Sequence, residues 1–86
     1  MKNEYIPQFP TLFRDLLVEN GITQQDLSNK TGIHKTQISQ YCTGHRRPSL
    51  ETLIKFADAI TTEKRGRLLY KLITWIREDI KKGGMS

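Results

Sequence analysis

The sequence predicts an all-α fold of five helices in a single domain that spans residues 1–86. Three observations predict it. Apolar residues recur at the spacing of one helical face in several stretches. Capping residues and glycines mark where those stretches begin and end. In addition, 86 residues with a hydrophobic fraction of 36% suit one small helical bundle. A chain of this length is near the lower limit of what one core can stabilise alone, so a second subunit would help.

The first predicted helix follows an N-terminal stretch without a periodic pattern. Pro7 and Pro10 argue against a long helix there. Residues 1–9 are therefore interpreted either as an arm over the surface or as a frayed terminus. A helix of about nine or ten residues should follow and end at Asn20-Gly21. Its apolar residues at helical spacing are Leu12, Phe13, Leu16 and Leu17.

The second helix has a clear start signal. Thr23 and Asp26 have the spacing of a capping box, in which each side chain bonds to the backbone of the other residue. Ile22 and Leu27 occupy the two positions of a hydrophobic staple around the same turn. The second helix should therefore begin at Gln24.

A single glycine separates the second and third helices. Gly32 can adopt the left-handed conformation that ends a helix, so the second helix should end at Thr31. The third helix should run from about Lys35 to Tyr41 or Cys42. Its buried face would hold Ile33, Ile38 and Tyr41. Two short helices joined in this way have the form of a helix-turn-helix.

The fourth helix follows a polar loop over residues 43–48, which must be exposed because it lacks large apolar side chains. Pro48 disfavours a helical residue before it, and Ser49 can cap the next helix. The expected buried stripe of that helix is Leu50, Leu53, Ile54, Ala57 and Ile60.

A long C-terminal helix is expected over about residues 62–82, ending at Gly83-Gly84. Gly66 is unfavourable inside a helix, which leaves two alternatives: the helix begins near Arg67, or another backbone approaches closely at Gly66. A four-helix core of this size is too small to cover all apolar residues of this helix, which indicates a dimer interface. The alternative is that the helix folds entirely onto its own core. The expected interface residues are Leu69, Leu72, Ile73, Trp75, Ile76 and Ile80.

The net charge of +5 is unevenly distributed. Residues 27–50 contain four cations and no acid, whereas residues 1–26 sum to −2. A second basic group contains Lys64, Arg65, Arg67 and Lys71. A basic surface beside a helix-turn-helix predicts a polyanionic partner.

Other classes of function are disfavoured. Cys42 and His45, with His34 nearby, lack the fourth ligand of a structural zinc site, and no acid accompanies them as in a catalytic triad. We therefore expect no metal, no cofactor and no enzymatic activity. The absence of a signal peptide or membrane span, together with a single cysteine, predicts a cytoplasmic protein that associates with the nucleoid when it binds DNA.

Several short motifs resemble the helix-turn-helix family of Cro and the phage repressors. The shared residues are Thr23-Gln24, Gly32-Ile33, Ile38-Ser39 and the run from Gly44 to Leu53. The resemblance covers a core of about residues 11–60 and implies a lambda-repressor-like fold. The sequence departs from the family pattern at Ser28, where alanine is usual, at His34, where a Ser or Thr cap is commoner, and at Cys42-Thr43, which replaces Glu-Asn. The second departure predicts a weaker cap on the third helix.

By this resemblance the third helix enters the major groove of double-stranded DNA. The residues expected to contact bases are Lys35, Thr36, Gln37 and Gln40, whose side chains offer the donors and acceptors that base edges require. Those expected to contact the DNA backbone are Thr23, Gln24, Ser39, Thr43, His45, Arg46 and Arg47. For Thr23 the cap is the first role and the phosphate contact the second.

The resulting hypothesis is a homodimeric prokaryotic or phage transcription regulator, most simply a repressor, that recognises a pseudo-palindromic operator. An alternative is an antitoxin that also represses its own operon, which would bring a toxin or another regulator as protein partner. A third interpretation is an interaction module whose basic group around Lys64 and Lys71 binds an acidic partner.

Overall fold

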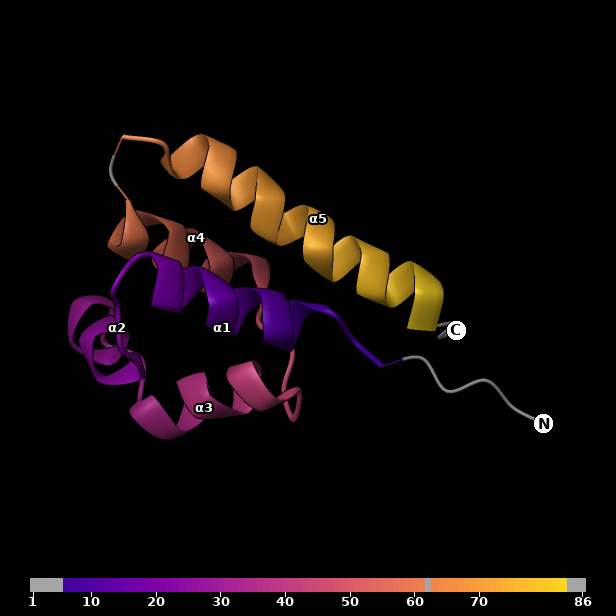
Figure 1. Ribbon diagram of the computed structural model, residues 1–86, viewed down its shortest axis with the longest axis horizontal. Helices are drawn as coiled ribbons and strands as arrows, with labels where there is room; N and C mark the ends of the chain where they lie inside the picture. The colour runs from indigo at the N-terminus through magenta and orange to yellow at the C-terminus, as the bar shows by residue number, and fades with distance from the viewer. Residues whose placement is uncertain (1–5, 62, 84–86) are drawn as a thin grey trace.

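The computed structural model describes residues 6–61 and 63–83, and these residues form five helices (Figure 1). The prediction of an all-α fold is confirmed. The predictions for residues 1–5, for a helix start at residue 62 and for Gly84 fall outside the described residues. The helices are α1 (Phe9–Glu19), α2 (Gln24–Thr31), α3 (Lys35–Thr43), α4 (Leu50–Ile60) and α5 (Arg65–Gly83).

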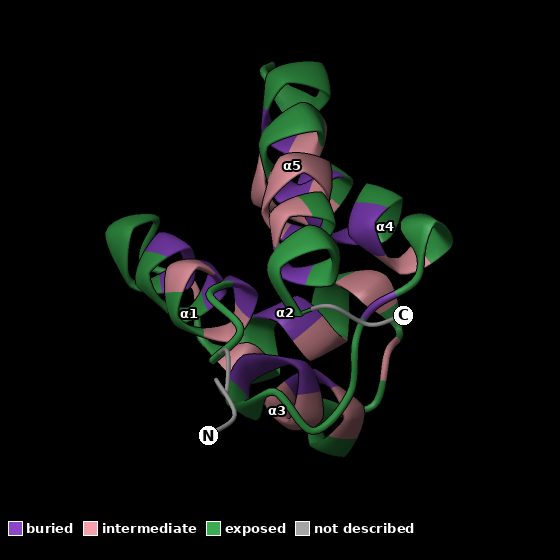
Figure 2. Ribbon diagram, turned by 90° about the vertical axis from the view of Figure 1, so that its right-hand side faces the viewer, coloured by how far each residue is buried: buried purple, intermediate pink, exposed green. Residues whose placement is uncertain are grey.

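A row of aromatic rings connects four of the helices through the core. The ring of Phe13 in α1 stacks on that of Phe56 in α4, with centroids 5.0 Å apart, and Tyr41 of α3 meets Phe56 edge-on at 5.8 Å. At the other end Phe9 stacks on Phe13 at 5.2 Å and meets Trp75 of α5 edge-on at 6.4 Å. Figure 2 shows the buried residues on the sides of the helices that face this core. Such pairs contribute beyond simple area burial, so the row helps to fix how the helices pack.

Helix α1 begins earlier than the sequence predicted. Phe9 was assigned to an arm, but it is the first residue of the helix and its side chain is only 2% exposed. Pro10 lies in the first turn, where its missing N–H costs no helical hydrogen bond. The cap comes from the far end of the chain, because the Asp79 carboxylate accepts from the backbone N–H of Gln8 (2.8 Å) and of Phe9 (2.9 Å).

The turn between α2 and α3 forms as expected, with additional hydrogen bonds. Gly32 has φ +80°, the left-handed conformation that ends α2. The Ser28 hydroxyl, in place of the usual alanine, donates to the Ile33 carbonyl at 2.6 Å and closes the turn. The prediction of a weak cap on α3 was wrong, since the His34 imidazole Nδ1 accepts from the Thr36 N–H at 3.1 Å.

The predicted buried stripe of α4 was partly wrong. Leu53 and Ala57 are buried, but Leu50 and Ile54 are 58% and 41% exposed. Phe56, which the predicted stripe omitted, is fully buried, and its ring contacts those of Phe13 and Tyr41 in the aromatic row. The error arose because Leu50 and Ile54 lie on an edge of the helix that the rest of the domain covers only in part.

Helix α5 packs on both α1 and α4 and covers more of its own apolar surface than expected. Leu68, Leu72 and Ile76 are buried in the core, and Leu69, Ile73 and Trp75 pack against it as half-buried residues. The helix starts at Arg65 with Gly66 in its first turn, and no other side chain or backbone beyond its chain neighbours and its own helical turn lies within 4 Å of the position that a Gly66 Cβ would occupy. Neither a start near Arg67 nor a close backbone approach explains this glycine. None of the helices within residues 6–61 and 63–83 is long and apolar enough to cross a bilayer.

Candidate nucleic-acid interface

One open groove of about 560 Å³ gathers polar side chains from α2, α3 and the loop that follows α3. The sequence analysis selected all of its lining residues, from positions far apart in the chain. The N-terminus of α2 therefore adjoins the exposed side of α3, as a helix-turn-helix requires. The lining residues are Gln24, Lys35, Thr36, Ser39, Gln40, Thr43 and His45.

Helix α3 is held to the domain by its opposite side. Ile38, Tyr41 and Cys42 are all at most 3% exposed, which fixes the rotation of the helix about its axis. At its C-terminal end the Arg14 guanidinium of α1 donates to the Cys42 carbonyl. Gly44 then ends the helix in a left-handed conformation with φ +87°. The groove is thus lined by a helix that cannot easily rotate or unwind.

The four candidate base-reading residues differ in how exposed their side chains are and in whether they already have a hydrogen-bond partner within the protein. Lys35 and Thr36 are exposed, and Gln40 is half-buried with its side chain lining the groove. The Gln37 amide instead donates to the Tyr41 hydroxyl at 2.6 Å, and Gln37 does not line the groove. Three of the four side chains are therefore positioned together, while the fourth has an intramolecular partner.

The start of α2 has the geometry predicted from its capping box. The Thr23 hydroxyl accepts from the Asp26 N–H at 3.0 Å, and the Asp26 carboxylate accepts from the Thr23 N–H at 3.0 Å. The pKa of Asp26 lies below its ordinary value. The main cause is the hydrogen bond with the Thr23 backbone, and the hydrogen bond with the Thr23 side chain is the second. This stabilising effect is complete above the ordinary aspartate pKa and is lost as the pH falls through the lowered one. Thr23 is thus a cap, and it leaves Gln24 at the edge of the groove.

The loop after α3 supplies the remaining candidates. Thr43 Oγ1 lies 2.7 Å from His45 Nδ1, and both residues also line the groove. Arg46 and Arg47 are exposed and form no ion pair with any residue within 6–61 and 63–83. They do not line the groove but a neighbouring cleft of about 240 Å³, beside Pro7 and Pro10. The two arginines therefore lie to one side of the groove with free guanidinium groups.

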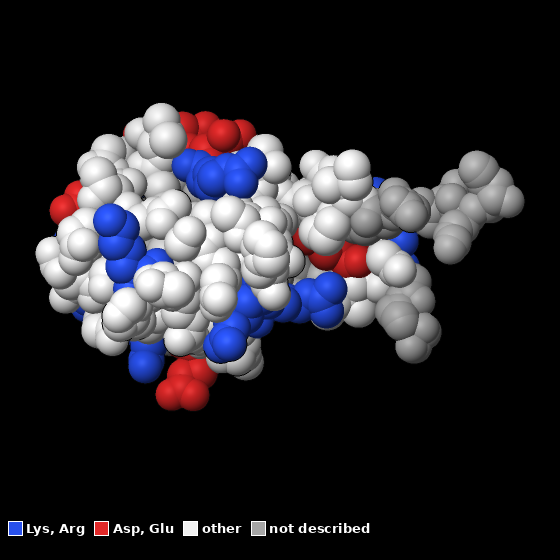
Figure 3. Space-filling model, turned by 90° about the horizontal axis from the view of Figure 1, so that it is seen from below, with Lys and Arg blue, Asp and Glu red and all other residues white. Residues whose placement is uncertain are grey.

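Charge on this side of the molecule is predominantly positive. Figure 3 views the face that carries α3 and shows Lys and Arg on several sides of an uncharged middle, with acidic groups at the top, left and bottom edges and one more inside the outline to the right. This agrees with the absence of any acid from residues 27–50. Neutral donors and acceptors in the middle with cations around them match what base edges and phosphates respectively require.

Cys42, which the sequence analysis interpreted as a small core residue, is fully buried. Burial raises the pKa of its thiol, although the nearby Arg14 guanidinium lowers it in part. The folded chain disfavours the thiolate form of Cys42. The resulting contribution to folding stability is therefore fully present at pH values below the thiol's ordinary pKa, and it is lost as the pH rises through the raised pKa. We expect iodoacetamide to alkylate Cys42 far more slowly in the folded protein than in denaturant at pH 8. Equal alkylation rates in mass spectrometry would contradict this placement.

Comparison with known families gave one match. A family described as helix-turn-helix has a sequence model that matches residues 13–64, which is more than half of the chain. The matched residues run from Phe13 to the turn before α5 and include every side chain that lines the groove. No curated protein and no solved structure matches the chain.

Proposed function

This chain belongs to the Cro-type helix-turn-helix family of DNA-binding transcription regulators, and from that premise we propose that it is a homodimeric repressor that reads a pseudo-palindromic operator. The observation that carries the proposal is the groove across α2 and α3, which brings Lys35, Thr36 and Gln40 to one surface. Lysine can donate to guanine O6 or N7, glutamine can pair with adenine N6 and N7, and threonine can contact either base type. Repression would follow from occupation of promoter DNA.

Selection of bound sites from random-sequence duplexes at about physiological salt tests this proposal. A two-fold dimer with one α3 in each of two successive major grooves requires half-sites about 34 Å apart. We therefore expect an enriched pseudo-palindrome with half-sites one helical turn apart. Bulk binding that depends on salt but enriches no sequence would refute the operator-specific function.

The two free arginines give a separate prediction. Replacing Arg46 or Arg47 with alanine should weaken binding to all duplexes alike and reduce the slope of log affinity against log salt by about one each, because each phosphate contact releases about one counterion. The measurement is a salt titration by fluorescence anisotropy. Lys82→Ala, which removes the same charge near the end of α5, is the control and should leave the slope unchanged. An unchanged slope for both arginine variants would remove them from the interface.

What supports a homodimer is the apolar surface along adjoining edges of α4 and α5. Leu50, Ile54 and Asp58 form one row at four-residue spacing, and the Arg65 guanidinium of α5 contacts the Asp58 carboxylate at 3.4 Å. The α5 row that begins at Arg65 therefore runs beside the α4 row. Exposed or half-buried apolar residues on these edges are Leu50, Ile54, Leu69, Ile73 and Ile80.

Some of the residues that the sequence analysis expected at the dimer interface have too little exposed surface to contact a second subunit. Leu72 is fully buried and Ile76 is only 9% exposed, so neither offers surface to a second subunit. Trp75 packs edge-on against Phe9, and its removal would disturb the core as well as any interface. The proposed contact therefore consists of Leu69, Ile73 and Ile80 from the original set, with Leu50 and Ile54 added.

Ile54→Glu should convert the dimer to a monomer, because it places a charge in the middle of the proposed contact. Sedimentation velocity measures the change. Val18→Glu is the matched control, since Val18 is also an exposed aliphatic residue on a helix but lies on α1, away from these edges. A dimer that persists in the Ile54 variant, or one lost equally in both variants, would exclude this interface.

The antitoxin alternative requires a surface for a second protein in addition to the DNA groove. The candidate for that surface is a cleft between α1 and α5, separate from the proposed dimer contact. A small toxin-like reading frame beside the gene for this chain would favour that alternative over a self-sufficient repressor.

A further inference from the structure

A cleft of about 190 Å³ lies between the second half of α1, the turn after α4 and the first half of α5. It is on the side of the domain away from α3, since Figure 1 shows α5 and α3 on opposite sides of α1 and α4. None of its residues lines the DNA groove, so a ligand here would leave the groove open. The lining residues are Leu16, Asn20, Ile60, Thr61, Lys64, Arg67, Leu68 and Lys71.

Three cations form the rim of this cleft. Lys64 directly precedes α5, and Arg67 and Lys71 follow it at spacings of three and four residues, which places the three cations on one side of the start of that helix. All three are exposed, and none forms an ion pair with a residue in the described part of the chain. Asp15 and Glu19 of α1 flank the cleft residue Leu16, yet neither is paired with these cations. The cationic groups thus remain available to an outside anion.

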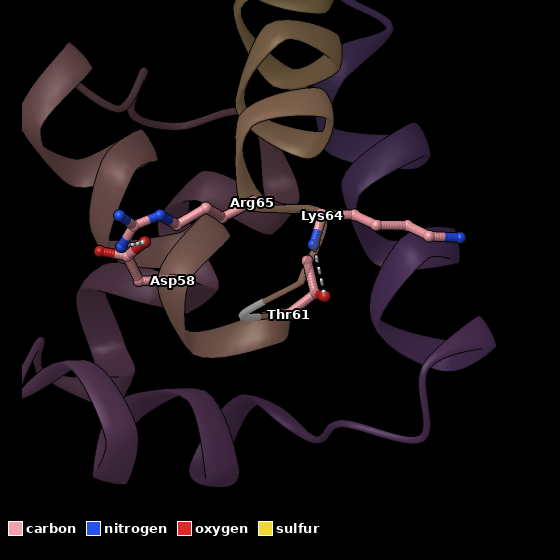
Figure 4. Close-up of polar contacts among 4 residues, drawn as sticks. All are labelled: Asp58, Thr61, Lys64 and Arg65. Carbon is pink, nitrogen blue, oxygen red and sulfur yellow. Dashed lines mark hydrogen bonds and ion pairs between the residues drawn. The ribbon is translucent and has the colours of Figure 1, made fainter.

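Neighbouring Arg65 behaves differently. Its guanidinium turns to Asp58 on α4, whereas the Lys64 side chain extends away from that pair on the other side of the turn (Figure 4). The Lys64 backbone N–H donates to Thr61 Oγ1 at 3.3 Å, which helps to hold the turn between the two helices. The turn therefore directs Arg65 toward an intramolecular acid and leaves Lys64, the residue before it, at the cleft.

The floor of the cleft is apolar. Leu16 and Leu68 are 9% and 8% exposed, and Ile60 is half-buried beside them. The Asn20 side-chain amide donates to the Leu16 carbonyl at 2.8 Å, so this polar residue is already partly satisfied. A matching ligand must therefore combine negative charge with an apolar group.

The size of the cleft limits the ligand further. Small-molecule sites usually enclose about 300 to 1,000 Å³, and this cleft is smaller and open. It suits one inserted side chain better than a whole effector molecule. A nucleic-acid backbone would supply charge but would leave the apolar floor unfilled.

We propose that this cleft docks an acidic segment of a partner protein, with one large apolar side chain on Leu16, Ile60 and Leu68. Carboxylates of the same segment face Lys64, Arg67 and Lys71. Because the cleft and the DNA groove lie on opposite sides, the partner binds while the protein is on DNA. The cleft is a different surface from the DNA groove and the dimer contact of the proposed repressor, so the outcome of operator selection does not decide this inference.

Selection from a random short-peptide library on the immobilised full chain tests the proposal. We expect enriched peptides to combine Asp or Glu with at least one large apolar residue. Their affinity, measured by fluorescence anisotropy, should fall about tenfold or more for Lys64→Glu with Lys71→Glu. Replacing the apolar peptide residue with serine should cause a loss of similar size, because the floor is then unfilled.

Two controls keep the result interpretable. Lys81→Glu with Lys82→Glu makes the same charge change at the other end of α5 and should leave peptide affinity unchanged. Lys64→Ala with Lys71→Ala gives a milder loss without adding repulsion, and circular dichroism checks that every variant is folded. The proposal is overturned if no acidic peptides are enriched, if both charge-reversal pairs weaken binding equally, or if the cleft binds random duplex DNA in place of peptides.

Discussion

Replacing Asp79 with alanine is expected to lower the free energy of unfolding by about 3 kcal/mol, because two backbone donors lose a charged acceptor. Asp79 is 3% exposed, and its two carboxylate oxygens receive the N–H groups of Gln8 and Phe9 at the first turn of α1. Gln8, the residue before the first turn of α1, makes no side-chain cap of its own. The carboxylate also lies at the positive end of the α1 dipole, which adds to its effect.

Chemical denaturation measures this loss against two comparison variants. Asp79→Asn keeps one acceptor oxygen and should lose about half as much stability. Glu78→Ala removes a neighbouring acid whose only ion pair within the described residues is a 4.0 Å contact with Lys82, and it should change stability by less than about 0.5 kcal/mol. If Asp79→Ala were no more destabilising than Glu78→Ala, the carboxylate would not be acting as the cap of α1.

Replacing both Lys35 and Gln40 with alanine is expected to reduce the preference for the selected operator over random duplex by about 100-fold. Each well-formed contact to a base edge contributes about 1 to 3 kcal/mol of discrimination, and these two residues line the same groove. Binding to random duplex should fall much less, because Arg46 and Arg47 remain. The two affinities must be measured at one salt concentration, since salt changes both.

Gln37→Ala is the informative comparison for that experiment. The Gln37 amide already donates to the Tyr41 hydroxyl, so its loss should change operator preference much less than the loss of Gln40. An equal effect would mean that Gln37 leaves Tyr41 and turns to the DNA. If the double variant lost affinity equally for every duplex, Lys35 and Gln40 would contact phosphates and not bases.

Local signals in the sequence were sufficient to predict the helix-turn-helix. The capping box at Thr23, the glycine at position 32 and the serine cap at position 49 each act within one helical turn, and all three form as predicted. The groove was predictable for the same reason, because its residues follow directly from the start of α2 and the exposed side of α3. Family membership then agreed with the motifs from which it had been inferred.

Tertiary packing decided the features that the sequence analysis missed. Pro7 and Pro10 lie on either side of Phe9, which led to its assignment to an arm, but its ring stacks on Phe13 and meets Trp75 edge-on within the core. Leu50 and Ile54 have suitable spacing for a core, yet only the position of α5 determines how much of that edge is covered. The burial of Asp79 did have a signal in the sequence. It is the one acid at a position that continues the buried stripe of Leu68, Leu72 and Ile76 along α5. An acid at a core position of an amphipathic helix indicates a buried donor nearby, although not which one.

The hydrogen bonds between Asp79 and the start of α1 also bear on synthesis of the protein. Phe9 is translated 70 positions before the carboxylate that caps it. Residues 13–64, which include every residue that lines the groove across α2 and α3, emerge from the ribosome before residue 79 does. The nascent chain can therefore assemble this groove early, but α1 acquires its full stability only when α5 emerges. Translation that stops short of residue 79 would leave a polypeptide with this groove and a frayed first helix, and we expect it to be a better substrate for proteolysis than a chain that includes Asp79.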